Sequence, residues 1–266
     1  MVVFLNKGNN MNDTKKVLSF AVELGDILLR NGAEVYRVED SVLAILNAYE
    51  ITDCDVYVLS NGIFASADEV TEHASSMIRH VPMYPMHLGR IAALNSLCRR
   101  VCAKEIELDA AWKELEECKK ISSYSLPVLV IATAIGCGGF SYMFGGTVLD
   151  ALCAVVVGAI LKLFLDFESR TTHSKTITNV LASMVIAIVA VLFYISGLPV
   201  HFDKIIIGSI MPLVPGIPLT NSIRDFINGD YLSGSIRVID ALLTSFCIAV
   251  GIGIVISIVK IGGIII

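Results

Sequence analysis

The stretch Ile205–Tyr231, with the sequence IIIGSIMPLVPGIPLTNSIRDFINGDY, decides how the chain is built. It begins as an apolar segment and is then interrupted by helix-breaking residues, namely Pro212, Pro215, Gly216 and Pro218. Proline lacks a backbone N–H and clashes with the carbonyl one turn earlier, so the prolines leave several carbonyl groups without partners. Within a bilayer such a break is tolerated only where it lines a cavity or is buried in protein. The stretch therefore predicts a broken membrane helix.

After the break the chain resumes as a polar helix that carries Asn221, Arg224 and Asp225. The first N–H groups of this helix lack partners within it and can hold a carboxylate, and the planar guanidinium of Arg224 matches the two carboxylate oxygens. We therefore predict a substrate site made of Pro212, Pro215, Gly216, Pro218, Thr220, Asn221 and Arg224. The simpler alternative is a membrane exit loop in which Thr220 or Asn221 caps the next helix.

Charge and hydropathy divide the 266 residues into two parts. Residues up to about Ser123 carry most of the charge, and long uncharged runs follow. This pattern predicts a soluble α+β domain over residues 1–122 and an α-helical transmembrane domain over residues 123–266. A basic patch with interleaved aromatic residues is absent, so we expect no nucleic-acid partner.

The sequence offers no expected catalytic, metal or cofactor site. The seven cysteines form no CxxC pair, and Cys98 and Cys102, which share a helix face, lack histidine or carboxylate company. Reduced, packed thiols are the expected state. No nucleophile, base and orienting group occur at a spacing that suits catalysis.

The soluble part has the pattern ααβββαα. We expect a first helix that is capped by Asn12 or Asp13 and ended by Asn31-Gly32, and a second helix from about Ala33. Strands follow at 55–60, 63–66 and 75–81, with Asn61-Gly62 as the positive-φ pair of a tight hairpin. The last two helices are expected at 87–102 and 108–121.

The second helix has one apolar stripe, made of Val35, Val38, Val42, Ile45, Leu46 and Tyr49. Its other face carries four charged residues, Glu34, Arg37, Glu39 and Asp40. Glu34 and Arg37 are three residues apart and can pair on the helix surface. A solvated charged face is the simpler interpretation of this set.

Five membrane spans are expected, at about 126–144, 147–165, 177–198, 202–219 and 232–260. The first contains the small residues Gly136–Gly139, which would let a neighbouring helix approach closely. Thr147 and Asp150 have capping-box spacing at the start of the second. Asp150 is therefore either a helix cap or a carrier of a transported proton.

Loop charges favour one orientation in the plasma membrane. With the soluble domain inside, the inner side collects Lys119, Lys120, Arg170, Lys175, Arg224 and Arg237. The outer side then has only Lys204 and Lys260. The positive-inside rule predicts a cytosolic N-terminal domain and an external C-terminus, and the first residues lack the basic start of a signal peptide.

Four segments carry a resemblance to the bacterial threonine/serine exporter family: Asn31–Asp40 (NGAEVYRVED), Asn61–Phe64, the run Ile91–Asn95 with Arg99, and Pro215–Asp225 (PGIPLTNSIRD). The resemblance implies secondary export of small hydrophilic metabolites, driven by the proton motive force. Fused members have about ten crossings, so this chain resembles the larger subunit of the split type, which works with a separate small membrane subunit. Its solute would be threonine and serine or a succinate-type dicarboxylate; a homo-oligomer is left open.

Together these observations predict an exporter subunit, not an enzyme. Asp225, helped by Asp150, would carry the coupled proton; the alternative is that Asp225 is a structural ion-pair partner of Arg224 or Arg237. Glu34, Arg37, Glu39 and Asp40 lie in a family-like motif without an assigned role. The alternative function is a membrane-tethered cytosolic enzyme or sensor domain, for which the bundle is only an anchor.

Overall fold

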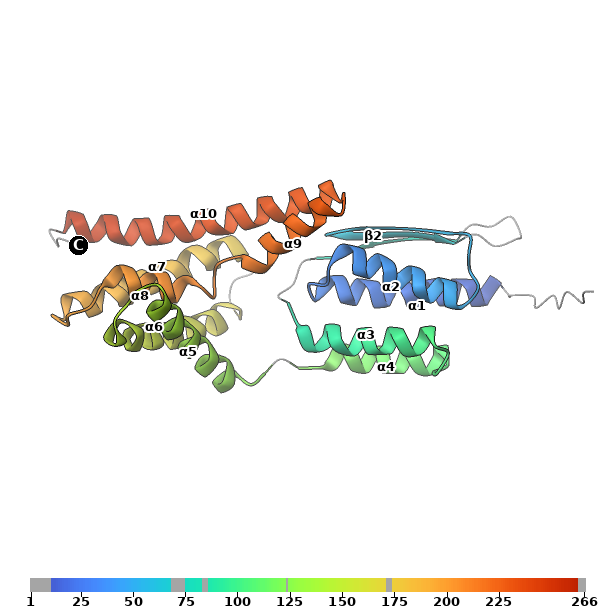
Figure 1. Ribbon diagram of the computed structural model, residues 1–266, viewed down its shortest axis with the longest axis horizontal. Helices are drawn as coiled ribbons and strands as arrows, with labels where there is room; N and C mark the ends of the chain where they lie inside the picture. Colours follow the sequence, from blue (N-terminus) through green and yellow to red (C-terminus); the bar gives the residue numbers. More distant parts are fainter. Residues whose placement is uncertain (1–10, 68–74, 83–85, 123, 171–173, 263–266) are drawn as a thin grey trace, which may run out of the picture. The chain divides into compact units, whose positions relative to one another are not determined.

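The computed structural model describes residues 11–67, 75–82, 86–122, 124–170 and 174–262 (Figure 1). Internal contacts divide the chain into two compact units. The first unit consists of Met1–Ser123 and Thr220–Arg237, and the second of Tyr124–Leu219 and Val238–Ile266. The boundary therefore falls inside two helices, α9 (Gly216–Ile227) and α10 (Tyr231–Ile261).

The first unit has the expected ααβββαα order. Its elements are α1 (Met11–Arg30), α2 (Val35–Ala48), β1 (Cys54–Leu59), β2 (Gly62–Ala67), β3 (Ser75–His80), α3 (Leu88–Cys102) and α4 (Leu108–Lys120). The strands form one antiparallel sheet in the order β1-β2-β3. Helices α1 and α2 pack against this sheet, and α3 and α4 pack together (Figure 1). The unit therefore has its own apolar core, which includes Phe20, Leu24, Ile63, Leu94 and Leu115.

The α2 stripe and the end of α1 are confirmed. Val35, Val38, Val42, Ile45 and Leu46 are buried, and Gly32 has φ +89°, the left-handed conformation that glycine adopts after a helix. The proposed cap of α1 is wrong, because the helix begins at Met11 and already includes Asn12 and Asp13.

The hairpin between β1 and β2 is confirmed, but its turn is not the expected one. Leu59 pairs with Gly62, so the loop is Ser60-Asn61 and Gly62 is the first residue of β2. Neither Asn61 nor Gly62 is among the residues with positive φ. Pairing with the third strand explains this, because Gly62 lies opposite His80 and the Asn61 carbonyl accepts from Val81 N at 2.8 Å.

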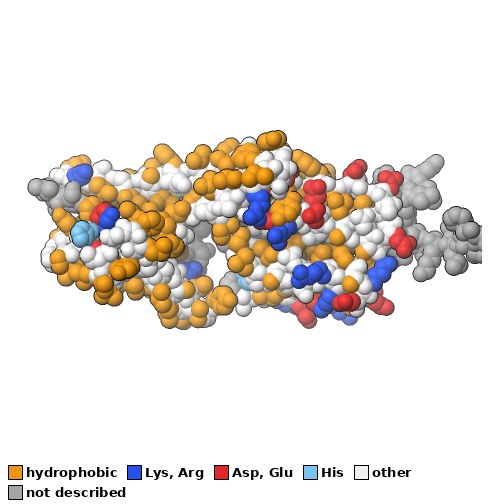
Figure 2. All heavy atoms as spheres, viewed as in Figure 1, with side chains coloured by type: hydrophobic (Ala, Val, Ile, Leu, Met, Phe, Trp, Pro, Cys, Tyr) orange, Lys and Arg blue, Asp and Glu red, His pale blue; other side chains and the backbone are white. Residues whose placement is uncertain are grey.

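The second unit is a helical bundle. It contains α5 (Leu126–Met143), α6 (Val148–Glu168), α7 (Lys175–Ile195), α8 (Phe202–Ile210) and most of α10. Within the described ranges, α5, α6, α7 and α10 are long and apolar enough to cross a membrane. Many large apolar side chains on these helices are exposed, among them Ile131, Leu152 and Phe246. Figure 2 shows such side chains covering much of the visible surface of this unit.

The remaining expected span is broken where the prolines predict. Helix α8 has nine residues and ends at Ile210, and α9 begins at Gly216. At 1.5 Å per residue α8 is roughly 14 Å long, about half of the ~30 Å hydrocarbon core. Pro212 and Pro215 lie in the break, whereas Pro218 lies in the first turn of α9, where a missing N–H leaves no hydrogen bond unmade.

Contacts inside the second unit show that the broken segment still passes from one end of the bundle to the other. His201, just before α8, contacts Asp150 at the start of α6. Lys175, at the start of α7, pairs with Asp240 near the start of α10 at 2.7 Å. Since α6 and α7 run in opposite directions, as consecutive packed helices joined by a short connection, these contacts place the starts of α8 and α10 at opposite ends. The segment between them therefore joins the two ends of the bundle.

Small residues set the close helix contacts in this bundle. A Cβ on Gly138 would meet Val155 Cγ2 at 2.6 Å and Ala151 O at 2.9 Å, so α5 and α6 touch there. Gly136 and Gly139 have open space instead. Gly138 is thus the glycine of this run that lets α5 and α6 approach closely, because neighbouring residues on a helix point to different sides.

Candidate functional site

Glu34 joins two arginines from distant parts of the sequence. It precedes α2 as its N-cap residue, and its Oε2 lies 2.8 Å from Arg37 Nε. Its Oε1 forms an ion pair with Arg224 Nη1 on α9. The carboxylate therefore ties the start of α2 to α9 within the first unit.

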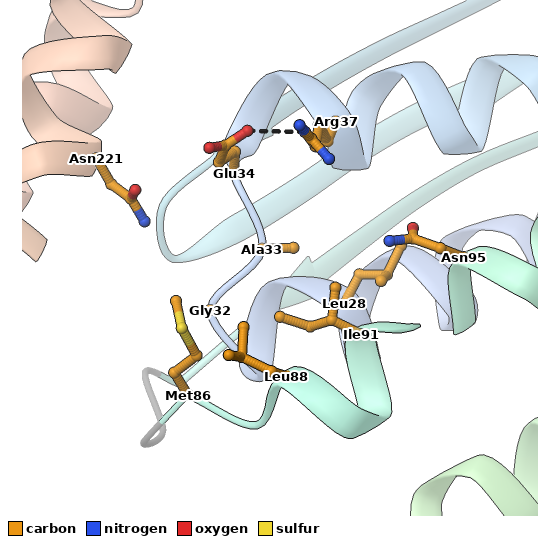
Figure 3. A pocket seen from close by; sticks show the side chains of 10 residues that line it. All are labelled: Leu28, Gly32, Ala33, Glu34, Arg37, Met86, Leu88, Ile91, Asn95 and Asn221. Atoms are coloured by element: carbon orange, nitrogen blue, oxygen red, sulfur yellow. Dashed lines mark ion pairs between the residues drawn. The ribbon is translucent and has the colours of Figure 1, made fainter. Parts of the chain in front are cut away.

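Beside this cluster lies a cavity of about 200 Å³ (Figure 3). Its lining comes from the end of α1, the start of α2, α3 and α9: Leu28, Gly32, Ala33, Glu34, Arg37, Met86, Leu88, Ile91, Asn95 and Asn221. Pockets for drug-sized ligands measure ≈ 300–1,000 Å³. The cavity is therefore of a size for a small metabolite.

The polar groups of the cavity are a carboxylate, a guanidinium and two amides. Glu34 and Arg37 lie on one wall, and Asn95 and Asn221 face the space from α3 and α9 (Figure 3). Arg37 can bind a carboxylate through its planar fork, Glu34 can accept from an ammonium or hydroxyl group, and each amide can both donate and accept. The apolar side chains of Leu28, Leu88 and Ile91 complete the lining, as is usual for small-molecule sites.

A buried ion pair lies next to this wall. Asp225 on α9 and Arg237 on α10 are 1% and 7% exposed, and Oδ2 lies 3.3 Å from Nη1. Arg237 Nη2 also points at the carbonyl of Ala33, at 3.5 Å. Burial raises the pKa of the Asp225 carboxyl, and Asp230 adds to the rise, while Arg237 and Arg224 oppose it. The carboxylate is thus held by a charge partner in a site that disfavours its charge.

The comparisons decide the family. A family profile described as "Putative threonine/serine exporter" matches residues 19–259. The chain belongs to the threonine/serine exporter family. It is 27% identical over 242 residues to a "Probable threonine/serine exporter" of Mycobacterium tuberculosis, covering 90% of this chain and 45% of that one. It is 24% identical over 244 residues to the "Threonine/serine exporter" of Corynebacterium glutamicum, covering 89% and 50%.

The chain thus spans about half the length of the curated relatives it matches. No solved structure matches it. Family membership and the four long apolar helices make it a membrane protein of an exporter family.

Three of the segments that resemble this exporter family meet at the cavity. Glu34 and Arg37 come from the segment 31–40, Asn95 from the run 91–95, and Asn221 from the segment 215–225. Glu39 and Asp40 are on α2 but do not line the cavity. Burial raises the pKa of Glu39, which also has Asp230 and Asp40 nearby.

The predicted substrate-site residues fall into both units. Pro212, Pro215, Gly216 and Pro218 belong to the second unit, and Thr220, Asn221 and Arg224 to the first. Of this set only Asn221 lines the cavity, while Arg224 acts on it through Glu34. Asn95 is not part of the site that the sequence predicts, although it lies in the family-like run 91–95.

Asp150 is a helix cap in the second unit. It completes a capping box with Thr147, and its Oδ1 accepts from His201 N at 2.7 Å. Its Oδ2 lies 3.0 Å from His201 Nδ1. Asp225 has Arg237 as its closest ion-pair partner, whereas Arg224 pairs with Glu34. Asp150 therefore has the contacts of a helix cap, and Asp225 has those of a structural ion-pair partner. These are the two alternatives to a proton-carrying role.

Proposed function

We propose that the chain is a subunit of a secondary exporter that moves small carboxylate metabolites out of the cell, driven by the proton motive force. The solute is threonine, serine or a succinate-type dicarboxylate. The observation that carries the proposal is the small cavity whose lining includes Glu34, Arg37, Asn95 and Asn221. It combines groups for a carboxylate with groups for an ammonium or hydroxyl, in a member of an exporter family.

A separate small membrane subunit completes the transporter in this proposal. The chain has four continuous candidate spans and one broken crossing among its described residues, which is little to enclose a polar path. The curated relatives are about twice as long. Transporters of this kind are commonly built from paired repeats with the solute path between them.

The cavity is the cytosolic collecting site in this mechanism. Arg37 binds the solute carboxylate, and Asn95 and Asn221 fix its orientation. The break around Pro212 and Pro215 then receives the carboxylate in the membrane domain. Asp225 carries the coupled proton, because its carboxyl is buried beside Arg237 and has a raised pKa.

Efflux of labelled threonine, serine and succinate from preloaded cells tests the proposal. The chain is expressed with and without the small subunit, before and after an uncoupler. We expect uncoupler-sensitive efflux of one solute that needs both subunits. Arg37→Ala and Asn221→Ala should reduce it by about tenfold or more through the loss of solute contacts, and Asp40→Asn, on the same helix but outside the cavity, should not.

A membrane-tethered sensor is the second candidate, and one observation favours it. The whole cavity lies in the first unit, so solute binding there needs no membrane path. Binding of the same solutes to the purified full chain, combined with no efflux of any of them, would identify this function and exclude the exporter.

A further inference from the structure

Helix α9 is amphipathic, but its polar side is buried and its apolar side is exposed, which is the opposite of a helix on the surface of a soluble domain. Its buried residues are polar, Ser222 and Asp225. Its apolar residues Leu219, Ile223 and Ile227 are four apart, lie on one side of the helix and are 44%, 54% and 79% exposed. A surface helix in water normally packs its apolar stripe inward. The outer side of α9 is therefore built for an apolar surrounding.

The apolar surface continues onto the start of α10. Tyr231 and Leu232 are 68% and 54% exposed, and the Tyr231 ring lies 6.3 Å from that of Phe226 on α9. In the part of the chain that the structure describes, Ile223, Ile227, Tyr231 and Leu232 thus form an apolar patch on the first unit. Arg224 and Asp225 do not interrupt it, because their charges are engaged with Glu34 and Arg237.

The length of α10 fixes the level of this patch in the membrane. The helix has 31 residues, which at 1.5 Å each is about 46 Å, compared with about 30 Å for the hydrocarbon core and 40–45 Å with both interfacial layers. Counting back about 20 residues from Lys260 reaches Ala241. The first ten residues of α10 therefore extend into an interfacial layer, where tyrosine is enriched.

We propose that α9 and the start of α10 lie in the interfacial layer of the bilayer, with Ile223, Ile227, Tyr231 and Leu232 inserted among the lipids. The chemistry is that of an in-plane amphipathic helix, whose apolar side reaches the boundary between headgroups and acyl chains. The polar side of α9 holds Asn221 and Arg224 on the first unit. This inference does not depend on the solute or on proton coupling.

Fluorescence quenching by brominated lipids tests the placement. The chain has a single tryptophan, Trp112, so Trp112→Phe with Ile227→Trp gives one reporter on the patch. In phosphatidylcholine vesicles brominated near the glycerol end of the acyl chains, we expect its emission to fall by about half, and to fall less with bromine near the methyl end. The matched control, Trp112→Phe with Ile78→Trp, places the reporter at a 73% exposed site on β3 and should show no quenching.

The ring of Trp112 packs edge-on against that of Phe20, with the ring centroids 5.4 Å apart, and Trp112→Phe changes this contact. Ile227→Trp and Ile78→Trp are therefore also measured with Trp112 retained, and the quenching of the parent chain is subtracted. Ile223→Trp, one turn earlier, should repeat the result. Quenching no greater than at Ile78→Trp would overturn the proposal. So would quenching that disappears when the small subunit is reconstituted with the chain, because the patch would then be a protein interface.

Discussion

The Asp225–Arg237 pair shows how much depends on single residues in this unit. Both side chains are buried, and their closest charged atoms are 3.3 Å apart without a hydrogen bond between them. A buried pair contributes little net stability, but removing one partner leaves an uncompensated charge. The pair is therefore more important for holding α9 to α10 in one arrangement than for the overall stability of the fold.

Arg237→Met should destabilise the chain by about 3 kcal/mol at neutral pH, because the buried Asp225 carboxylate then loses its counter-charge. Asp225→Asn combined with Arg237→Met should recover most of that loss, since neither charge remains. Chemical unfolding in detergent measures both variants. Equal stability of the single and double variants would show that the two side chains are not coupled.

The raised pKa of Asp225 also predicts a dependence of stability on pH. A carboxyl whose pKa is higher in the folded chain than its ordinary value of about 3.9 binds more protons when folded. Its contribution to the free energy of unfolding is therefore largest below that value and is lost as the pH rises through the raised pKa. Unfolding curves from pH 4 upward should show this decline in the parent chain, and Asp225→Asn should remove it. An unchanged slope in the variant would assign the dependence to another group.

At the scale of elements, the parts of the structure that depend on local pattern were predictable. The α2 stripe follows from apolar residues at helical spacing, and the break after Ile210 follows from Pro212 and Pro215. The conformation of the hairpin turn was not predictable, because the pairing of Gly62 with β3 sets its backbone. Local sequence does not contain that long-range constraint.

The candidate site was predictable only in its pieces. Glu34 and Arg224 both lie in segments that carry the family resemblance, yet they are 190 residues apart, and no periodicity indicates that the two charges meet. The cavity forms only when α1, α2, α3 and α9 pack together, so Asn95 had no local signal beyond its family-like run. Tertiary packing decides such contacts, as it does for most sites made from distant segments.

Helix contacts in the bundle predict different effects for two glycines of α10. A Cβ at position 251 would meet Ser183 Oγ and Val180 O of α7, whereas a Cβ at 253 would meet nothing within 4 Å. Gly251→Ala should therefore force α10 from α7 and lower the thermal midpoint in detergent by several degrees, as about 1–3 kcal/mol of overpacking would. Gly253→Ala is the matched control and should be neutral or stabilising, because alanine favours helix. Equal midpoints would contradict the close approach.

At the scale of the whole molecule, the five expected crossings predict that the start of α1 and the end of α10 lie on opposite sides of the membrane. Within the described bundle, four continuous helices and the broken α8 segment account for these crossings. The loop charges favour the first unit in the cytosol. A reporter that is active only outside the membrane should therefore be active when fused after residue 266 and inactive when fused before Met11. The opposite pattern would reverse the orientation.

Helix α10 also has a mechanical consequence. It runs unbroken from Tyr231 to Ile261, with Arg237 buried in one unit and Asp240 paired to Lys175 in the other. A helix is stiff along its axis, so two groups three residues apart on it cannot move independently. A 10° tilt of a rod about 46 Å long displaces one end by roughly 8 Å relative to the other. Any tilt of α10 is therefore shared along its whole length, from Tyr231 to Ile261.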